Sequence, residues 1–181
     1  MTPWWRANQK PGERDFTYFF SRVNKSALRT AILDKLKQEF DLQTRAAHLA
    51  RDEATSEESR AENKYDTHSQ EAAYLAEGQA RLANELEISL AQYATLPLPD
   101  FTPDAAIEIG ALVELHARGT SAWYFLGPRN GGLELRVDDR DILLLTPQAP
   151  LGRQLLGKRK GNTVESSGRA NAVTYRIVTV E

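Results

Sequence analysis

Carboxylates gather in one short stretch of this chain, ATSEESRAENKYDTHSQE, which runs from Ala54 to Glu71. Between positions 52 and 66 the chain has six acidic and two basic residues, although its formal net charge is only −2. The candidate functional side chains there are the carboxylates of Glu57, Glu58 and Glu62. Carboxylates are hard oxygen ligands for divalent cations, and they also favour the positive end of a helix. The segment therefore predicts either a metal-linked role or a solvated helix start.

The helix-start alternative has a specific form in this sequence. Ser59 and Glu62 have the spacing of a capping box, in which each side chain accepts a hydrogen bond from the other residue's backbone amide. This interpretation needs no partner and no metal, so the spacing of the acids alone leaves both alternatives open.

Cysteine and histidine offer no competing site. The chain has no cysteine, which removes disulfides, thiolate nucleophiles and cysteine metal ligands. His48, His68 and His116 have no partner at a spacing typical of zinc sites. We expect His68 to be a partly buried member of a helical seam.

Two long helical patterns flank the acidic stretch. Asn24 or Ser26 can cap the first helix, because their short side chains accept hydrogen bonds from unpaired backbone amides. The hydrophobic residues of the first pattern share one helical face: Ile32, Leu36, Phe40, Ala47, Ala50 and Ala54. Those of the second recur at steps of three and four, with Gln79 and Ser89 in the remaining positions: Ala61, Tyr65, His68, Ala72, Leu75, Leu82, Leu86 and Tyr93.

These patterns predict an antiparallel coiled-coil hairpin over residues 24–95, with the acidic stretch at its tip. Each arm should be roughly 40 Å long at the rise of an α-helix. The seam is bulky near the base and mostly alanine towards the turn, so we expect the hairpin to taper.

The rest of the chain divides into a linker and a strand-rich region. Residues 96–105, LPLPDFTPDA, contain three prolines, which end the helix and favour an extended backbone. Residues 106–181 contain short strand patterns, including AIEIGALVELHA, SAWYFLG, LELRVDD, DILLLTP and AVTYRIVTV. One short helix is expected within APLGRQLLGK, with Pro150 in its first turn and Gly157 at its end. The sequence thus predicts an α+β protein, with the hairpin followed by a small antiparallel sheet domain.

Residues 1–23 carry six of the fifteen aromatic residues without a helical or strand period. Three interpretations stay open: a poorly ordered extension, a segment that docks on a partner through its aromatic residues, or a region before a natural start near Val23.

Composition narrows the class of protein. Charged residues make up 27% of the chain and hydrophobic residues 41%, as in folded domains. No apolar run is long enough to span a bilayer, and the polar N-terminus does not fit a secretory signal. The lack of cysteine fits a cytoplasmic location. The near-neutral charge argues against a protein that covers duplex DNA phosphates.

Two stretches of the chain carry motifs of a known family. The stretch AENKYDTHSQEAAYLAEGQARLANELE has Glu62-Asn63 at the expected turn and Glu77-Gly78 fifteen residues later, and it resembles the second arm of the hairpin in the Gre family of bacterial transcription elongation factors. The stretch LLLTPQAPLGRQLLGKRKGNTV is similar to the Ser/Thr-Pro, Gly-x-x-Leu-x-Gly-Lys, Gly-Asp/Asn pattern of the C-terminal domain of that family. Together with the order of the elements, the resemblance covers residues 24–181.

This resemblance implies a fold and a function. The C-terminal domain would be FKBP-like and would anchor the protein on RNA polymerase, while the hairpin would enter the polymerase secondary channel. Glu62, with Glu58 or Glu57, would help to hold a magnesium ion shared with the polymerase active centre. The protein would then be a monomeric factor that stimulates the polymerase's own cleavage of backtracked RNA, with no cofactor of its own. It would contact nascent RNA and DNA only indirectly. The basic turn at Lys158, Arg159 and Lys160 is either a simple loop or a contact with the partner.

The turn departs from the family pattern Asp-Leu-x-Glu-Asn. Aligned on Glu62 and Asn63, the chain has Ser59 at the aspartate position, which would leave the metal one anionic ligand short. An alternative role is therefore a secondary-channel regulator that binds polymerase without stimulating cleavage and competes with other Gre factors. The FKBP-like fold also raises peptidyl-prolyl isomerisation as an enzyme alternative, which rests on fold likeness alone.

Overall fold

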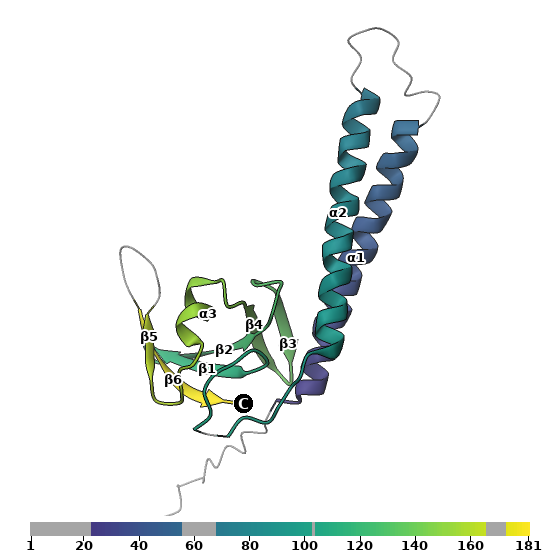
Figure 1. Cartoon of the computed structure of the whole chain (residues 1–181). Coiled ribbons are helices and arrows are strands. Elements are labelled where there is room, and N and C mark those ends of the chain that lie inside the picture. Colours follow the sequence, from purple (N-terminus) through teal and green to yellow (C-terminus); the bar gives the residue numbers. More distant parts are fainter. Residues whose placement is uncertain (1–22, 56–67, 103, 166–172) are drawn as a thin grey trace, which may run out of the picture.

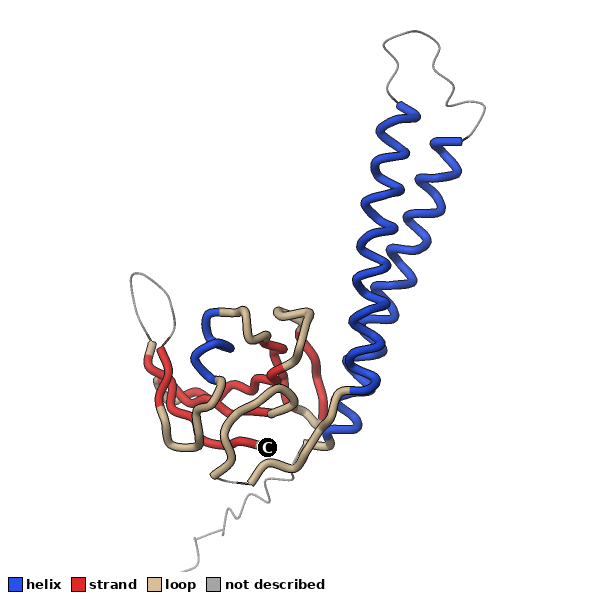
Figure 2. Tube along the Cα trace, viewed as in Figure 1, coloured by secondary structure: helices blue, strands red, loops and turns tan. Residues whose placement is uncertain are grey.

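A two-helix hairpin projects from a small sheet domain in the computed structural model of the protein (Figure 1). The model describes residues 23–55, 68–102, 104–165 and 173–181. Helices α1 (Lys25–Thr55) and α2 (His68–Thr95) run antiparallel and pack along their length, and the sheet lies beside their lower ends (Figure 2). The predicted α+β class is confirmed.

Helix α1 begins where the sequence placed a cap. The side-chain oxygen of Asn24 accepts hydrogen bonds from the backbone amides of Ser26 and Ala27, at 3.0 and 3.2 Å. These amides have no partner within the helix, so the cap satisfies donors that would otherwise be exposed to water. Of the two predicted capping residues, Asn24 fills the role.

The hairpin seam matches the prediction on α1 better than on α2. Leu28, Ile32, Leu36 and Ala50 are buried on α1. On α2 the predicted positions 72, 86, 89 and 93 are buried, but Leu75 and Leu82 are exposed, and that part of the prediction is wrong. Ala83 is buried in place of Leu82, and Ala76 is half-buried beside Leu75. Small residues at these positions let the two helices approach closely.

Six strands form one mixed sheet in the described residues. The order across the sheet is β3-β4-β2-β1-β6-β5. The strands are β1 (Leu112–Ala117), β2 (Thr120–Leu126), β3 (Glu134–Val137), β4 (Arg140–Leu145), β5 (Thr163–Glu165) and β6 (Thr174–Val180). Neighbouring strands are antiparallel except β2 and β4, which are parallel. The expectation of a wholly antiparallel sheet is therefore wrong at this pair, and the predicted first strand begins only at position 112.

The sheet has a hydrophobic cluster on each face. Phe125 of β2 packs with the hairpin, whereas the next residue, Leu126, packs with Leu155 of the short helix α3 (Pro150–Leu155). This alternation is the two-residue period of a strand buried on both sides. The helix was predicted, with Pro150 at its start and Gly157 just past its end in the left-handed region, at φ +74°.

The proline-rich connection between α2 and β1 is part of the packed structure. Phe101 and Ile107 are buried in the cluster that contains α3. The amine of Lys25 at the start of α1 lies 4.7 Å from the centre of the Phe101 ring, a cation–π contact. The connection thus links the base of the hairpin to the sheet. Among the described residues, no helix is both long and apolar enough to cross a membrane.

Candidate functional site

The acidic residues singled out in the sequence fall between the two hairpin helices. Helix α1 ends at Thr55 and α2 begins at His68, at the ends of the helices that lie farthest from the sheet (Figure 1). Glu57, Glu58 and Glu62 lie outside the described residues, and so does Ser59. Their roles, as catalytic or metal-binding groups, stay predictions.

A second candidate metal site would have to lie in the part of the chain that the structure describes. In that part of the chain, no group of three or more histidine, cysteine, aspartate or glutamate side chains could hold a metal ion. His48 is exposed on α1, and the Nδ1 atom of His116 lies 3.2 Å from the Ser121 hydroxyl on the paired strand. The magnesium role of Glu62, Glu58 or Glu57 stays a prediction.

The hairpin base and the sheet share one hydrophobic cluster. If the hairpin were joined to the sheet domain only by a flexible linker, its buried residues would be limited to the interface between its own two helices. Here the hairpin and sheet side chains interlock into a single core. The buried members are Val23, Leu28, Ile32, Leu36, Leu86, Tyr93, Leu112, Phe125, Leu135, Val137, Ile142 and Leu144. Tilting the hairpin would expose this apolar surface to water, so the cluster holds the hairpin at a fixed angle.

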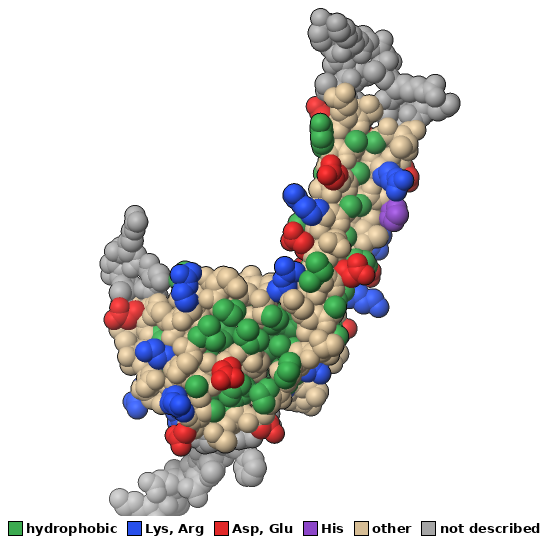
Figure 3. Space-filling view, viewed as in Figure 1, with side chains coloured by type: hydrophobic (Ala, Val, Ile, Leu, Met, Phe, Trp, Pro, Cys, Tyr) green, Lys and Arg blue, Asp and Glu red, His purple; other side chains and the backbone are tan. Residues whose placement is uncertain are grey.

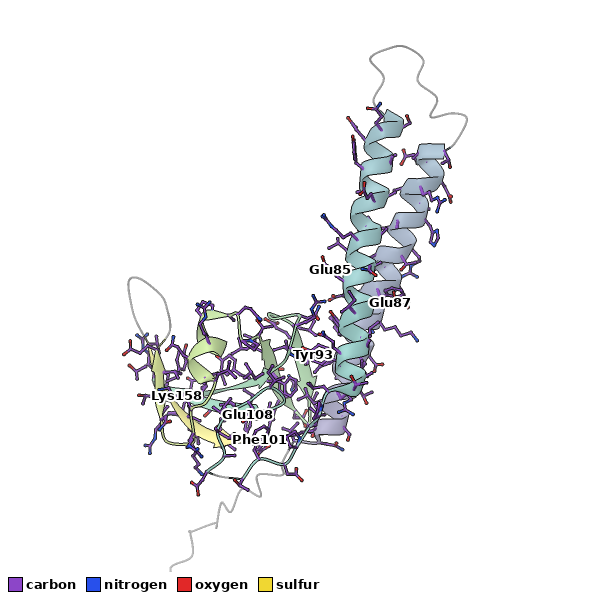
Figure 4. The ribbon with its side chains drawn as sticks, viewed as in Figure 1. Glu85, Glu87, Tyr93, Phe101, Glu108 and Lys158 are labelled. Atoms are coloured by element: carbon purple, nitrogen blue, oxygen red, sulfur yellow. The ribbon has the colours of Figure 1, made fainter. Side chains whose placement is uncertain are left out.

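Tyr93 supplies a directional contact at the same junction (Figure 4). Its hydroxyl donates a hydrogen bond to the backbone carbonyl of Arg129 at 2.6 Å. Burial raises the pKa of the Tyr93 phenol above its ordinary value, so the phenol stays protonated and remains a donor. Gly127 makes room for this contact, because a Cβ there would lie 2.2 Å from the Tyr93 hydroxyl.

The start of α1, on the other side of the hairpin base from Tyr93, is bound to the sheet domain through backbone amides. The amide of Val23 donates to the Glu181 side chain at 3.2 Å, and the amide of Asn24 donates to the Asp138 side chain at 3.1 Å. Asp138 lies in the turn between β3 and β4. The entry to α1 is therefore attached both to an edge hairpin of the sheet and to the end of β6.

A cavity of about 540 Å³ lies where the hairpin meets two loops of the sheet domain. We call it the junction cavity. Glu39 of α1 and Leu82, Glu85, Leu86 and Ser89 of α2 line one side. Pro128, Arg129, Asn130, Thr146 and Gln148 are among the residues that line the other. The cavity combines acidic side chains from the hairpin with a basic side chain from the loops.

The basic turn follows α3 at the side of the sheet domain away from the hairpin, as the label of Lys158 in Figure 4 shows. Lys158, Arg159 and Lys160 are all exposed. Arg159 is held in place, since its amide donates to Asn162 at 3.0 Å and its guanidinium donates to the Asp104 carbonyl. The turn presents three cations on a defined backbone, but the geometry does not connect them with the hairpin acids.

Sequence reasoning missed the junction. The stretch GPRNGG carried no functional prediction, but the backbone carbonyl of Arg129 in it accepts the Tyr93 hydrogen bond, and Arg129 lines the junction cavity. The available signal was Tyr93 itself, because a buried tyrosine at the end of a helical seam usually needs a partner for its hydroxyl.

Fold and site together define an α+β protein whose helical hairpin is fixed to a mixed sheet by a shared core. The chain is similar to the solved structure of GreA factor homolog 1 (Gfh1) of Thermus thermophilus, at 16% identity over 82% of this chain and 94% of that one, with a TM-score of 0.35. It is also similar to Thermus aquaticus Gfh1, at 18% identity over 88% of this chain and 96% of that one, with a TM-score of 0.37.

A third solved structure with this similarity is the prokaryotic transcription elongation factor GreA/GreB from Nitrosomonas europaea. The identity is 19% over 54% of this chain and 78% of that one, and the TM-score is 0.34. No protein-family model and no curated protein matches the chain.

Proposed function

We propose that this protein is a transcription elongation factor of the Gre type that binds bacterial RNA polymerase. The proposal is supported by the two Gre-like sequence motifs and by one structural observation. That observation is the slender pair of long helices, anchored in a sheet domain, with the acidic stretch in the connection between their far ends. Such a shape allows carboxylates to act at a distance from the surface on which the protein is anchored.

The hairpin sets the reach of this action. Helix α1 has 31 residues, which corresponds to about 45 Å at the rise of an α-helix. In the proposal the hairpin enters the polymerase secondary channel, and Glu62, assisted by Glu58 or Glu57, meets the catalytic centre. The protein acts in the cytoplasm as a monomer and contacts nascent RNA and DNA only indirectly.

Carboxylates suit the proposed task. A magnesium ion in a two-metal site positions the attacking water and stabilises the leaving oxygen in phosphodiester cleavage. The polymerase supplies most of that site, so the factor needs to add only one or two hard oxygen ligands. Glu62 and Glu58 would supply them, and the cleavage of backtracked RNA would remain the polymerase's own reaction.

The sheet domain supplies the anchor in this proposal. Lys158, Arg159 and Lys160 are exposed cations on a fixed turn and would contact acidic groups of the partner. Lys158 lies on the side of the domain away from the hairpin (Figure 4), so anchoring and catalysis would use separate surfaces.

A second candidate function follows from one residue. Ser59 stands where the Gre pattern has an aspartate, and a serine hydroxyl is a weaker ligand than a carboxylate for magnesium. In this alternative the protein occupies the secondary channel, excludes other Gre factors and stimulates no cleavage.

Two measurements on purified polymerase separate these functions. The first is direct binding of the full chain to polymerase, and the second is the rate of RNA cleavage in stalled, backtracked elongation complexes. Binding with faster cleavage supports the cleavage factor. Binding without cleavage, together with competition against a Gre factor, supports the regulator. No binding to polymerase contradicts both.

A further inference from the structure

Two stripes with the same order of residue types run along the hairpin. Each has a glutamate at both ends, two leucines inside them and a small residue in the centre. The steps of three and four residues place the members of each stripe on one face of its helix. The stripe of α1 is Glu39, Leu42, Ala46, Leu49 and Glu53, and that of α2 is Glu71, Leu75, Gly78, Leu82 and Glu85.

The four leucines of the stripes lie at the surface. Leu42 and Leu49 are 57% and 71% exposed, and Leu75 and Leu82 are 53% and 44% exposed. The seam between the helices is built from other positions, so these leucines do not hold the hairpin together. Large apolar side chains that recur at seven-residue intervals on a helix surface are typical of a helix–helix contact.

Both stripes lie on one side of the hairpin. Glu39 of α1 and Leu82 and Glu85 of α2 line the same junction cavity, so the lower ends of the two stripes meet there. The opposite side has a groove of about 450 Å³ that includes Phe40, Ala83 and Glu87 in its lining and none of the four leucines. In Figure 4, Glu85 lies on the side of α2 nearer the sheet domain, and Glu87 lies on another side. We call the side with both stripes the leucine face.

Gly78 is a second and independent observation on this face. A glycine inside a helix is destabilising relative to alanine, because it loses more backbone freedom on folding. A Cβ at Gly78 would have no atom within 4 Å, so nothing in the described part of the chain requires a glycine there. Glycine at a helix surface allows the backbone of another helix to come close. Its place between Leu75 and Leu82 puts that approach at the centre of the α2 stripe.

We propose that the leucine face binds an amphipathic helix of another protein, which carries an apolar stripe flanked by lysine or arginine. The leucines and Gly78 receive the apolar stripe, and Glu39 and Glu85 attract the flanking cations. Figure 3 shows that hydrophobic side chains on the hairpin are bordered by charged ones in that view as well. A second copy of this chain is a poorer occupant, because a symmetric pair would bring the same glutamates together. The inference does not depend on RNA polymerase being the partner.

The test uses the full chain and two synthetic peptides locked as helices by a side-chain crosslink. Both peptides have leucine at the apolar positions. One has arginine at the flanking positions, and the other has glutamate there. We expect the arginine peptide to bind with a Kd at least tenfold lower than the glutamate peptide, measured by fluorescence anisotropy at low salt. The double variant L75Q/L82Q should bind the arginine peptide at least tenfold more weakly than the wild type does.

Gly78→Ala distinguishes a binding role from a structural one. The alanine should raise Tm by about 2 °C, because it favours the helix. It should weaken binding of the arginine peptide several-fold, because the added methyl group keeps the partner helix away. The control Ile109→Gln, at another exposed apolar residue, should leave binding unchanged.

Three results would overturn the proposal. The first is an equal Kd for the arginine and glutamate peptides, and the second is a Kd of L75Q/L82Q for the arginine peptide that equals the wild-type value. The third is a wild-type protein that sediments as a dimer while L75Q/L82Q sediments as a monomer. The last would identify a second copy as the occupant.

Discussion

The hydroxyl of Tyr93, in the last turn of α2, donates a 2.6 Å hydrogen bond to the backbone carbonyl of Arg129, in the loop between β2 and β3. This bond joins two parts of the molecule 36 residues apart in the chain. Tyr93 is 1% exposed, and its ring belongs to the cluster that the hairpin shares with the sheet. The Tyr93 side chain therefore stabilises the junction in two ways, through the burial of its ring and through a directional hydrogen bond from its hydroxyl.

Removing only the Tyr93 hydroxyl should weaken the junction. Tyr93→Phe keeps the ring but leaves the Arg129 carbonyl without its donor, so we expect unfolding free energy to fall by about 1 kcal/mol. Urea denaturation followed by circular dichroism measures the change. The matched control is Tyr74→Phe, on a residue that is 74% exposed, which should alter stability very little. Equal effects of the two changes would contradict the role assigned to the bond.

Alkaline pH should act through the same phenol. Burial raises the pKa of Tyr93 above the ordinary tyrosine value of 10.0, so above that pH the phenol ionises in the unfolded chain but not in the folded one. Its contribution to stability is constant at neutral pH and is lost as pH rises from about 10. Tyr93→Phe should make the fall in stability above pH 10 shallower. Tyr124, whose pKa is also raised by burial, should maintain part of the slope.

Asn24 and Ser26 were equivalent capping candidates in the sequence, and the structure separates them. Asn24→Ala removes the acceptor for two amides of the first turn and should lower the unfolding free energy by about 1 kcal/mol. Ser26→Ala should have a much smaller effect. Thermal unfolding of both variants compares them directly, and a larger loss at Ser26 would show that the cap is wrongly assigned.

Gly152 in α3 is in contact with the backbone of the preceding loop. A Cβ at this position would lie 2.0 Å from the carbonyl oxygen of Thr146, so the helix or the loop must move to accept any side chain. Gly152→Ala should therefore lower the unfolding free energy by about 1–3 kcal/mol. Gly78→Ala is the matched control in a helix with free space, and it should be stabilising. Destabilisation by both would point to a cause other than the close approach.

Under the proposed cleavage function, Glu62 is the critical acid. Glu62→Ala should abolish stimulation of RNA cleavage while binding to polymerase stays within a factor of about two, because in the proposal the sheet domain supplies the anchor. The assay is cleavage of backtracked complexes alongside a binding titration. Cleavage at the wild-type rate would show that the role of Glu62 is wrong.

Ser59 should respond in the opposite direction. Ser59→Asp adds an anionic oxygen ligand at the position where the Gre pattern has one, so the rate of stimulated cleavage should rise. Ser59→Asn has a similar size without the charge and serves as the control. No change with Ser59→Asp would show that position 59 supplies no metal ligand, and it would remove the observation on which the regulator alternative rests.

Local patterns predicted most of the elements but not how they face one another. The α2 seam shows the limit, because Leu75 and Leu82 lie one residue away from Ala76 and Ala83, and both sets fit steps of three and four. The larger side chains favoured Leu75 and Leu82 as seam residues, but in the structure Ala83 is buried while Leu75 and Leu82 are exposed. Which set is buried depends on the partner helix, and the pattern of one helix does not contain that information.

The relative direction of the strands could not be predicted from the sequence for a similar reason. The alternation of apolar and polar residues predicts that β2 and β4 are strands, but this alternation is the same in parallel and antiparallel pairs. Their parallel pairing arises because β3 folds back on β4 at the sheet edge, which leaves β4 to lie beside β2. The three residues of β5 were too few to show a period. The FKBP-like description of the sheet domain and the role of the acids at positions 57, 58 and 62 stay predictions.

The hydrophobic cluster shared by the sheet and the base of the hairpin fixes the direction of the two helices. Over a length of about 45 Å, a tilt of about 5° at the foot would displace the far end by about 4 Å, more than the length of a metal–oxygen bond. Packing changes at Leu28, Phe125 or Tyr93 would therefore be magnified at a point that none of these side chains touches. The direction in which the hairpin points therefore depends on the side chains packed at its base.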